Sequence, residues 1–167
     1  MTNATRILLL SLTLTACGFH LRGSDLKDVS FSFSSLYIKS TGETQFVADL
    51  RKALVSRKVQ LATSSDQAEL ILEIVSEETS KQILSLSGSG RVQEYQLFYR
   101  VSLRAYDNEL ANWLPPDQIS LSRILVYDDA QILAKQQEES LLYKDMRTDA
   151  VGQTMRRLSR AKPHVTQ

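Results

Sequence analysis

The chain has 167 residues, 43% of them hydrophobic and 23% charged, with 20 basic and 19 acidic side chains. This near-neutral balance argues against a nucleic-acid-binding protein, which usually carries a strongly basic surface. One cysteine and two histidines are too few for a zinc site and exclude an internal disulfide. We therefore expect one globular domain with an ordinary hydrophobic core and no metal or other cofactor.

The first 16 residues are typical of a secretory signal peptide. Arg6 is their only charged residue, an apolar stretch follows at 7–14, and small residues stand directly before Cys17. The apolar stretch is too short for a helix that crosses a ~30 Å hydrocarbon core, which needs about 20 residues. We expect this segment to direct export and not to span the membrane.

Cys17 has three possible roles: a reactive thiol, an incidental unpaired cysteine, or the attachment point of a lipid. The sequence Leu14-Thr15-Ala16-Cys17 resembles the lipobox of bacterial lipoproteins and favours lipid attachment. Two or more acyl chains such as palmitate anchor a protein stably, whereas one binds only marginally. Because Gly18 and not aspartate follows the cysteine, the pattern resembles lipoproteins sent to the outer membrane. We expect lipid anchoring there, on the periplasmic side.

These features divide the chain into four parts. We predict a signal peptide at 1–16, an acylated N-terminus and tether at 17–30, a single domain at 31–160, and a flexible tail at 161–167.

A strand and then a helix are predicted at the start of the domain. Alternating apolar residues predict a short strand at 35–40, and helical spacing predicts a helix from about 43 to 59. Ser40 and Glu43 stand three residues apart, as in a capping box, although either residue between them is an alternative cap. The apolar positions at helical spacing are Val47, Leu50, Leu54 and Leu61.

Two long strands are predicted next. The segments 68–78 and 91–107 both alternate, and the glycine-containing segment 85–91 is a flexible hairpin connection between them. The second strand has one apolar and one polar face, which is typical of an antiparallel sheet. Phe98 interrupts the polar face and is either an interface residue or covered by a neighbouring loop.

A turn, a strand and a long helix complete the predicted domain. The paired prolines of segment 112–117 predict a turn, a strand follows at 118–128, and Asp128 or Asp129 caps a helix from about 129 to 159. The expected buried stripe of this helix is Ala134, Leu141, Val151, Met155 and Leu158. The order β-α-β-β-β-α predicts an α+β two-layer sandwich, with a four-stranded, mostly antiparallel sheet and two helices packed on one face.

Motifs of catalysis are absent from the sequence. It has no G-x-S-x-G elbow, no Walker loop and no G-x-G-x-x-G. Its paired acids are most simply explained without catalysis, Glu77-Glu78 as a strand edge, Asp128-Asp129 as a helix cap and Glu138-Glu139 as a solvated helix face. We predict that the protein is not an enzyme; a hydrolase without a recognisable motif is the minor alternative.

Three segments resemble the lipopolysaccharide-assembly lipoproteins of the LptE family. CGFHLRG at 17–23 is similar to the mature start of the family, and 90–107 resembles its central strand with Glu94-Tyr95-Gln96. The segment 132–146 resembles the start of its last helix around Ala134-Lys135.

The resemblance implies a role and two partners. Such proteins plug the large outer-membrane β-barrel of the lipopolysaccharide translocon (LptD) in a one-to-one complex, help it to fold, and bind lipopolysaccharide during its delivery to the cell surface. A near-neutral, hydrophilic exterior fits the polar lumen of a large barrel. The alternative is a free periplasmic lipid- or glycan-binding lipoprotein without a barrel partner.

The resemblance also implies lipopolysaccharide-binding cations. Lys135 matches the family position at the start of the last helix, and Arg91 is the loop cation, although it lies a few residues later than its family counterpart. Arginine and lysine suit the phosphates of this ligand, but both residues can equally be solvated surface cations. Arg156 and Arg157 belong to a basic cluster that is either a helix end or a contact with lipopolysaccharide or anionic lipid.

Overall fold

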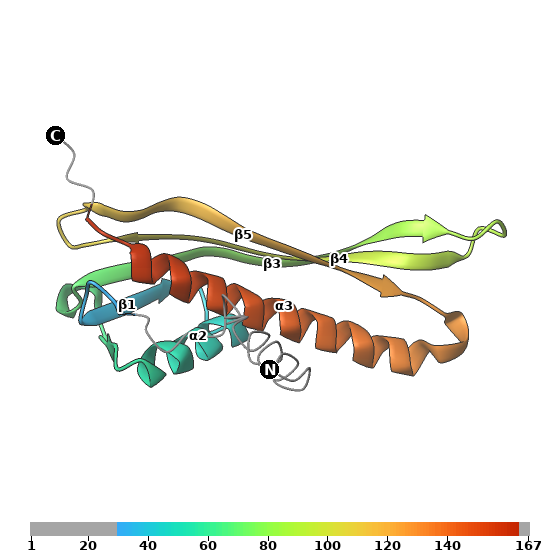
Figure 1. The fold of residues 1–167 in the computed structure, drawn as a ribbon, viewed down its shortest axis with the longest axis horizontal. Helices are drawn as coiled ribbons and strands as arrows, with labels where there is room; N and C mark the ends of the chain where they lie inside the picture. The colour runs from blue at the N-terminus through green and yellow to red at the C-terminus, as the bar shows by residue number, and fades with distance from the viewer. Residues whose placement is uncertain (1–29, 164–167) are drawn as a thin grey trace, which may run out of the picture.

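The computed structural model describes residues 30–163, so the predicted signal peptide, Cys17 and nearly all of the tether lie outside the described part of the chain. One β-sheet is covered on one face by two helices (Figure 1). The predicted α+β class with two helices is confirmed. In chain order the elements are β1 (Ser35–Ser40), α2 (Gln45–Ser56), β2 (Gln60–Leu61), the 3-10 turn η3 (Ser65–Gln67), β3 (Leu70–Leu86), β4 (Val92–Tyr106), β5 (Asn112–Val126), the 3-10 turn η4 (Asp129–Gln131) and α3 (Ile132–Arg160).

The sheet has five strands in the order β2-β1-β3-β4-β5, so the prediction of four strands is wrong. The additional strand, β2, consists of two residues that pair with Ser35 and Leu36 of β1. Two residues are too few to show the alternation by which a strand is recognised. β1 runs parallel to both β2 and β3, whereas β4 runs antiparallel to both β3 and β5, so the sheet is mixed.

The first helix begins at a different cap from those predicted. Thr44 is the N-cap of α2, and its hydroxyl accepts a hydrogen bond from the backbone N–H of Val47 at 3.3 Å. The capping box between Ser40 and Glu43 and the two alternative caps between them are therefore wrong. The Ser40 hydroxyl instead donates to the backbone carbonyl of Gly42 at 2.9 Å, within the loop that precedes the helix. The buried side chains of α2 are Phe46, Val47, Leu50 and Leu54, whereas Leu61 lies in β2.

The predicted turn at 112–117 is also wrong, because this segment is the first part of β5. The chain reverses five residues earlier, at 107–111. The Asp107 carboxylate accepts hydrogen bonds from the backbone N–H groups of Glu109 and Ala111, at 3.0 and 2.9 Å, and so closes the turn. An aspartate that binds the backbone two residues on is a common turn former.

Pro115 and Pro116 lie within β5 because this strand is the edge of the sheet. The register between β4 and β5 shifts here, so that both prolines lie opposite Arg104. A bulge of this kind leaves the extra residue unpaired, and an edge strand tolerates the missing N–H groups.

The second helix begins at Ile132, after η4. Asp128 accepts a hydrogen bond from the backbone N–H of Ala130 at 2.9 Å and so caps η4, while Gln131 stands at the N-cap of α3. The prediction that Asp128 or Asp129 caps the long helix itself is therefore wrong. Within the predicted stripe, Val151, Met155 and Leu158 are buried, but Ala134 and Leu141 are exposed.

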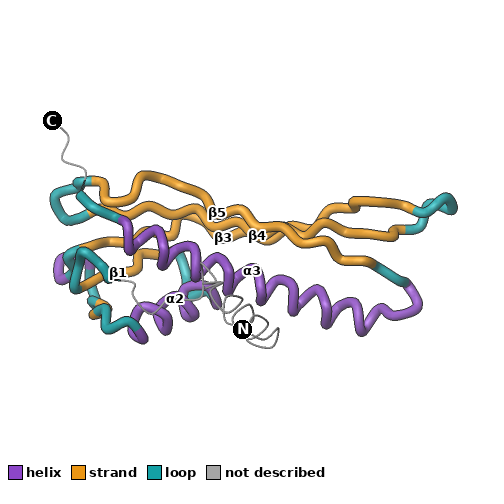
Figure 2. The backbone as a smooth tube through the Cα atoms, in the orientation of Figure 1, coloured by secondary structure: helices purple, strands orange, loops and turns teal. Residues whose placement is uncertain are grey.

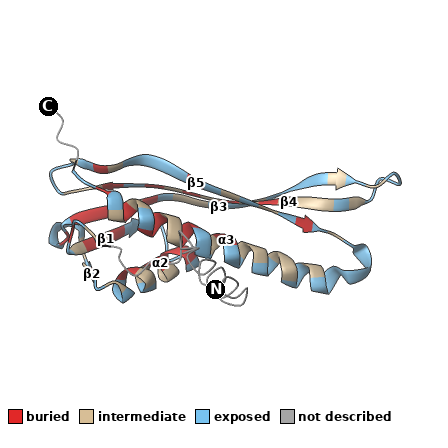
Figure 3. Cartoon of the chain, viewed as in Figure 1, coloured by how far each residue is buried: buried red, intermediate tan, exposed pale blue. Residues whose placement is uncertain are grey.

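The exposed start of α3 reflects the uneven distribution of the core. The buried residues concentrate in β1, α2, the first part of β3, most of β4 and the second half of α3 (Figure 3). Beyond Ile74 no residue of β3 is buried, and no residue of α3 before Met146 is buried. Figure 2 shows these parts of β3 and α3 running on past α2. We call residues 75–86, 92–98, 121–126 and 132–145 the extended half.

A polar network lies where the extended half meets the core. The Tyr99 hydroxyl donates to Glu77 Oε1 at 2.5 Å, and Arg147 Nε on α3 donates to Asp49 Oδ2 on α2 at 2.9 Å. Burial, together with the Glu77 carboxylate, raises the pKa of Tyr99 far above its ordinary value, so the hydroxyl keeps its proton. The second carboxylate oxygen of Glu77 is buried without a partner.

Candidate functional site

Arg91 lies at the tip of the β3–β4 hairpin. The tip is closed by hydrogen bonds from Ser87 N to the Arg91 carbonyl at 2.7 Å and from Arg91 N to the Ser87 hydroxyl at 3.1 Å. Gly90 has a φ of +79°, a conformation that glycine adopts without strain. The Arg91 side chain is exposed, and its guanidinium has no hydrogen-bond or ion-pair partner among residues 30–163. It is therefore available to an anion.

Lys135 lies in the first turn of α3 and is less accessible than Arg91. Its Nζ is 2.8 Å from Glu138 Oε2 on the same helix, and its side chain is 17% exposed. An anionic ligand at this position therefore competes with a carboxylate already present.

The structure brings Arg91 and Lys135 to the same end of the molecule (Figure 1). The backbone N–H of Tyr127, just before α3, donates to the Gln93 carbonyl at 2.8 Å. The start of α3 and the hairpin tip are thus held together through the end of β5. Forty-four positions separate the two cations in the sequence, and the pairing of β4 with β5 brings their elements to the same end of the sheet.

A third cation of this end was missed in the sequence analysis. Lys81 Nζ on β3 is 2.6 Å from Glu139 Oε2 on α3 and lies 4.1 Å from the centre of the Tyr95 ring. The Tyr127 ring meets that of Tyr95 edge-to-face, with the centroids 5.2 Å apart. The register pairs Lys81 with the buried Leu97, which places the lysine on the helix-covered face of the sheet. The sequence shows only a lysine on an ordinary strand, so no local signal identifies this residue.

Exposed aliphatic side chains occur along the same half of the molecule as these cations. Most of the exposed large hydrophobic residues of the described chain belong to the extended half or to the start of α3, although such residues usually favour the core. A surface that combines cations with exposed aliphatic groups suits an amphiphile with anionic groups and fatty chains. These residues are Val75, Ile83, Leu84, Leu86, Ile124, Val126, Ile132, Leu133 and Leu141.

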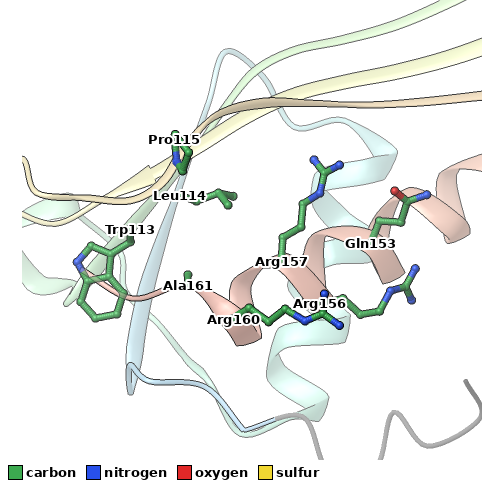
Figure 4. Close-up of a pocket in the computed structure, with 8 residues that line it drawn as sticks. All are labelled: Trp113, Leu114, Pro115, Gln153, Arg156, Arg157, Arg160 and Ala161. Carbon is green, nitrogen blue, oxygen red and sulfur yellow. The ribbon is translucent and has the colours of Figure 1, made fainter. Parts of the chain in front are cut away.

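The predicted basic cluster lies at the opposite end of α3, and it lines a cleft of about 450 Å³ (Figure 4). Gln153, Arg156, Arg157 and Arg160 extend from the last turns of α3, while Trp113, Leu114 and Pro115 lie across from them on β5. We call this the arginine cleft. Sequence reasoning found the cluster but not the cleft, because the apolar wall comes from the segment predicted as a turn.

One arginine of the cleft is held by an acid, and two are not. Arg157 Nη1 is 2.8 Å from Asp117 Oδ2, an ion pair that connects α3 to β5. The guanidinium groups of Arg156 and Arg160 have no hydrogen-bond or ion-pair partner within the described residues. The predicted site residues therefore form two separate sites, with Arg91 and Lys135 at one end and Arg156 and Arg157 at the other.

Phe98 contributes to the uncovered face of the sheet and is half-buried. The guanidinium carbon of Arg100 lies 4.7 Å from the centre of its ring. This side chain thus stacks on the phenylalanine, which explains how an aromatic residue is accommodated on a polar face.

Residues 30–163 contain neither a metal site nor a membrane-spanning helix. This part of the chain contains no group of three or more histidine, cysteine, aspartate and glutamate residues placed to hold a metal ion. It also contains no helix with the length and hydrophobicity required to cross a membrane.

The family model described as lipopolysaccharide-assembly, LptE, matches residues 29–158 of the chain. The match covers most of the sequence and includes every helix and strand except the last two residues of α3. No curated protein matches the chain significantly.

Solved structures of lipoproteins share the fold. The solution structure of an uncharacterised lipoprotein B from Nitrosomonas europaea is 39% identical, with a TM-score of 0.72 over 85% of this chain and 90% of that one. The crystal structure of the rare lipoprotein B from Shewanella oneidensis is 25% identical, with a TM-score of 0.65 over 73% and 91% of the two chains. A minor lipoprotein from Acinetobacter baumannii, 21% identical, has the same fold with a TM-score of 0.66 over 82% of this chain and all of that one.

Proposed function

The chain belongs to the lipopolysaccharide-assembly family LptE, and on this basis we propose that it is an outer-membrane lipoprotein that plugs and helps assemble the translocon β-barrel. In this role it binds lipopolysaccharide on its way to the cell surface and catalyses no reaction. Its anchor is a set of acyl chains on Cys17, on the periplasmic side of the outer membrane. Intact-mass measurement of protein from the native host tests the anchor, and an unmodified thiol would contradict it.

The observation that carries ligand binding is the shared location of Arg91 and Lys135. Both cations lie at the end of the extended half, next to exposed aliphatic residues such as Leu86 and Leu133. Lipopolysaccharide combines phosphates with acyl chains, and the two kinds of side chain match its two chemistries. The extended half provides this surface because β3, β4 and α3 continue beyond the core.

Two variants test the ligand site. The combined change Lys135→Asp and Arg91→Asp should weaken lipopolysaccharide binding about tenfold or more, because a hydrogen bond to a charged group contributes ~1.5–3 kcal/mol. The matched control, Lys52→Asp with Lys162→Asp, makes the same change in net charge at two exposed lysines outside the extended half. Equal losses in the two proteins would show that only net charge matters and would refute the assignment of Arg91 and Lys135.

Co-purification tests the barrel partner. After mild detergent extraction, the protein should be recovered in a one-to-one complex with a very large β-barrel, identified by mass. The Lys135→Asp, Arg91→Asp variant should retain this complex. Recovery of the protein alone would favour the second candidate, a free periplasmic lipid- or glycan-binding lipoprotein, which the exposed aliphatic surface also suits.

A further inference from the structure

We propose that the arginine cleft binds the phosphate of an anionic phospholipid headgroup in the membrane that anchors the protein. This site lies at the opposite end of α3 from Arg91 and Lys135 and is distinct from the lipopolysaccharide site. The inference depends on the proposed function in one respect, since the lipid anchor brings the membrane close.

The charge of the cleft requires an anion. Arg156 and Arg160 line it without an acidic partner among the described residues, and the Arg156 guanidinium lies back along α3 beside Gly152. The one nearby ion pair uses Asp117 for Arg157. Uncompensated guanidinium groups on adjacent turns of a helix repel one another, and a bound phosphate removes this repulsion. Guanidinium groups match phosphate oxygens in geometry as well as in charge, because two parallel N–H donors bind two oxygens.

Neutralisation of the helix end does not account for this arrangement. Cations in the last turn of a helix interact favourably with its free carbonyl groups. Arg156, however, lies a full turn before the last residue of α3, and Gln153 lies a further turn back. With Arg160 they form a row of donors at spacings of three and four along one side of the helix. This row faces the cleft over more than one turn.

The opposite wall of the cleft has the chemistry of a membrane interface. Trp113 is 9% exposed, and its indole N–H donates to Asp107 Oδ2 at 2.9 Å, which holds the ring in place. Leu114 and Pro115 continue the apolar wall. Tryptophan is enriched where lipid headgroups meet the acyl region, so a phosphate on the arginines leaves apolar parts of the lipid next to this ring.

The cleft also lies close to the start of the described chain. The Phe33 ring packs edge-to-face on Trp113, with the ring centroids 6.4 Å apart. The rings of Phe31 and Phe33 also pack together, with their centroids 5.2 Å apart. Phe31 is fourteen residues from Cys17, and a chain of this length spans at most ~50 Å when fully extended. A membrane that holds Cys17 is therefore within reach of the cleft. This proximity favours a membrane lipid over free phosphate.

The test uses the full mature chain with Cys17→Ser, so that binding cannot come from the anchor. Vesicles of phosphatidylcholine with phosphatidylglycerol should bind this protein, and vesicles of phosphatidylcholine alone should not. Trp113 is the only tryptophan of the chain, so its fluorescence reports directly on the cleft. Binding should change the wavelength or the intensity of its emission. An unchanged spectrum with bound vesicles would place the contact elsewhere and overturn the proposal.

Charge variants locate the contact. In this background, Arg156→Gln with Arg160→Gln should weaken vesicle binding about 25-fold, because each cation near an anionic membrane contributes ~1 kcal/mol, or about fivefold. Both side chains are exposed, so the variant should fold, which circular dichroism verifies. The control Lys52→Gln with Lys144→Gln removes the same charge. Equal weakening by the control would overturn the proposal.

Two further arms separate this inference from its alternatives. Titration with inorganic phosphate that shifts the Trp113 emission, without any binding of anionic vesicles, would assign the cleft to a free phosphate and overturn the lipid. Loss of the barrel complex in the arginine variant, with vesicle binding unchanged, would assign it to an acidic segment of the barrel. The Lys135→Asp, Arg91→Asp variant should still bind the vesicles, so failure of the lipopolysaccharide site is distinguishable from failure of the cleft.

Discussion

Lys81 on β3 and Glu139 on α3 form an ion pair, with Nζ 2.6 Å from Oε2, that joins the first part of α3 to the sheet. Tyr143 makes a second connection, because its hydroxyl donates to the Ser80 carbonyl at 3.1 Å. Few buried apolar contacts hold the two layers together in the extended half, so these polar contacts determine where the start of α3 lies. Their loss should therefore affect local opening more than global stability.

Lys81→Gln should increase hydrogen exchange in residues 132–145 and leave residues 146–160 unchanged. The free energy of unfolding should fall by less than about 1 kcal/mol, because the pair is partly exposed and screened by water. Arg123→Gln, which breaks an ion pair between β5 and Asp149 in the second half of α3, serves as the control. Unchanged exchange in residues 132–145 of Lys81→Gln would show that Tyr143 and the packing of α3 hold this part of the helix on the sheet without the ion pair.

Glu138→Gln should strengthen lipopolysaccharide binding. The Glu138 carboxylate occupies the Lys135 ammonium, and its removal frees this cation for the ligand. The expected gain is about 1.5- to 5-fold, corresponding to the ~0.2–1 kcal/mol of an exposed ion pair. Titration of the purified protein with lipopolysaccharide measures it, and Asp145→Asn, an exposed acid of the same helix, is the control. Weaker binding in Glu138→Gln would mean that Lys135 is not a ligand contact.

Tyr99→Phe should destabilise the protein by about 1–3 kcal/mol, because it leaves the Glu77 carboxylate without its hydrogen bond. The other oxygen of Glu77 is already buried without a partner, so the residue has no alternative. Denaturant unfolding gives the magnitude. Adding Glu77→Met to this variant should recover most of the lost stability, because two apolar side chains leave no buried polar atom without a hydrogen bond. A double variant as unstable as Tyr99→Phe would refute this explanation.

Asp107 should make the stability of the protein sensitive to acid. The hydrogen bond from the Trp113 indole, with those from the backbone N–H groups of Ala111 and Glu109, holds the pKa of Asp107 below its ordinary value. A carboxylate with a lowered pKa in the folded state contributes stability above the ordinary aspartate value of about 3.9, and this contribution is lost as the pH falls below it.

The measurement is the free energy of unfolding at several pH values. It should fall less steeply with decreasing pH, over about pH 5 to 2, in Asp107→Asn than in the unmodified protein. Trp113→Phe should reduce the slope in part, because it removes the strongest donor. Identical slopes in all three proteins would exclude Asp107 as the acid-sensitive group.

Local pattern was sufficient for much of the fold. The strand at Ser35–Ser40, the long strand that became β4 and the buried end of α3 were predicted from periodicity, which residues express within a few positions of one another. The prediction failed at 112–117, where paired prolines indicated a turn. The sheet tolerates these prolines because β5 is an edge strand. The prolines themselves do not indicate that β5 has a neighbouring strand on one side only.

The sequence by itself determined the family, the α+β class and the identity of the cations, because these follow from contiguous motifs and from composition. The lipid anchor at Cys17 stays a prediction of the same kind. Only the tertiary structure decided where these cations lie: it placed the hairpin tip of Arg91 and the start of α3 at one end of the molecule, engaged Lys135 and Lys81 with acids, and set Arg156 and Arg160 in the lining of a cleft that Trp113 also lines. The physical reason is that a binding site depends on distances between side chains, and strand pairing and helix packing set those distances between residues far apart in the chain.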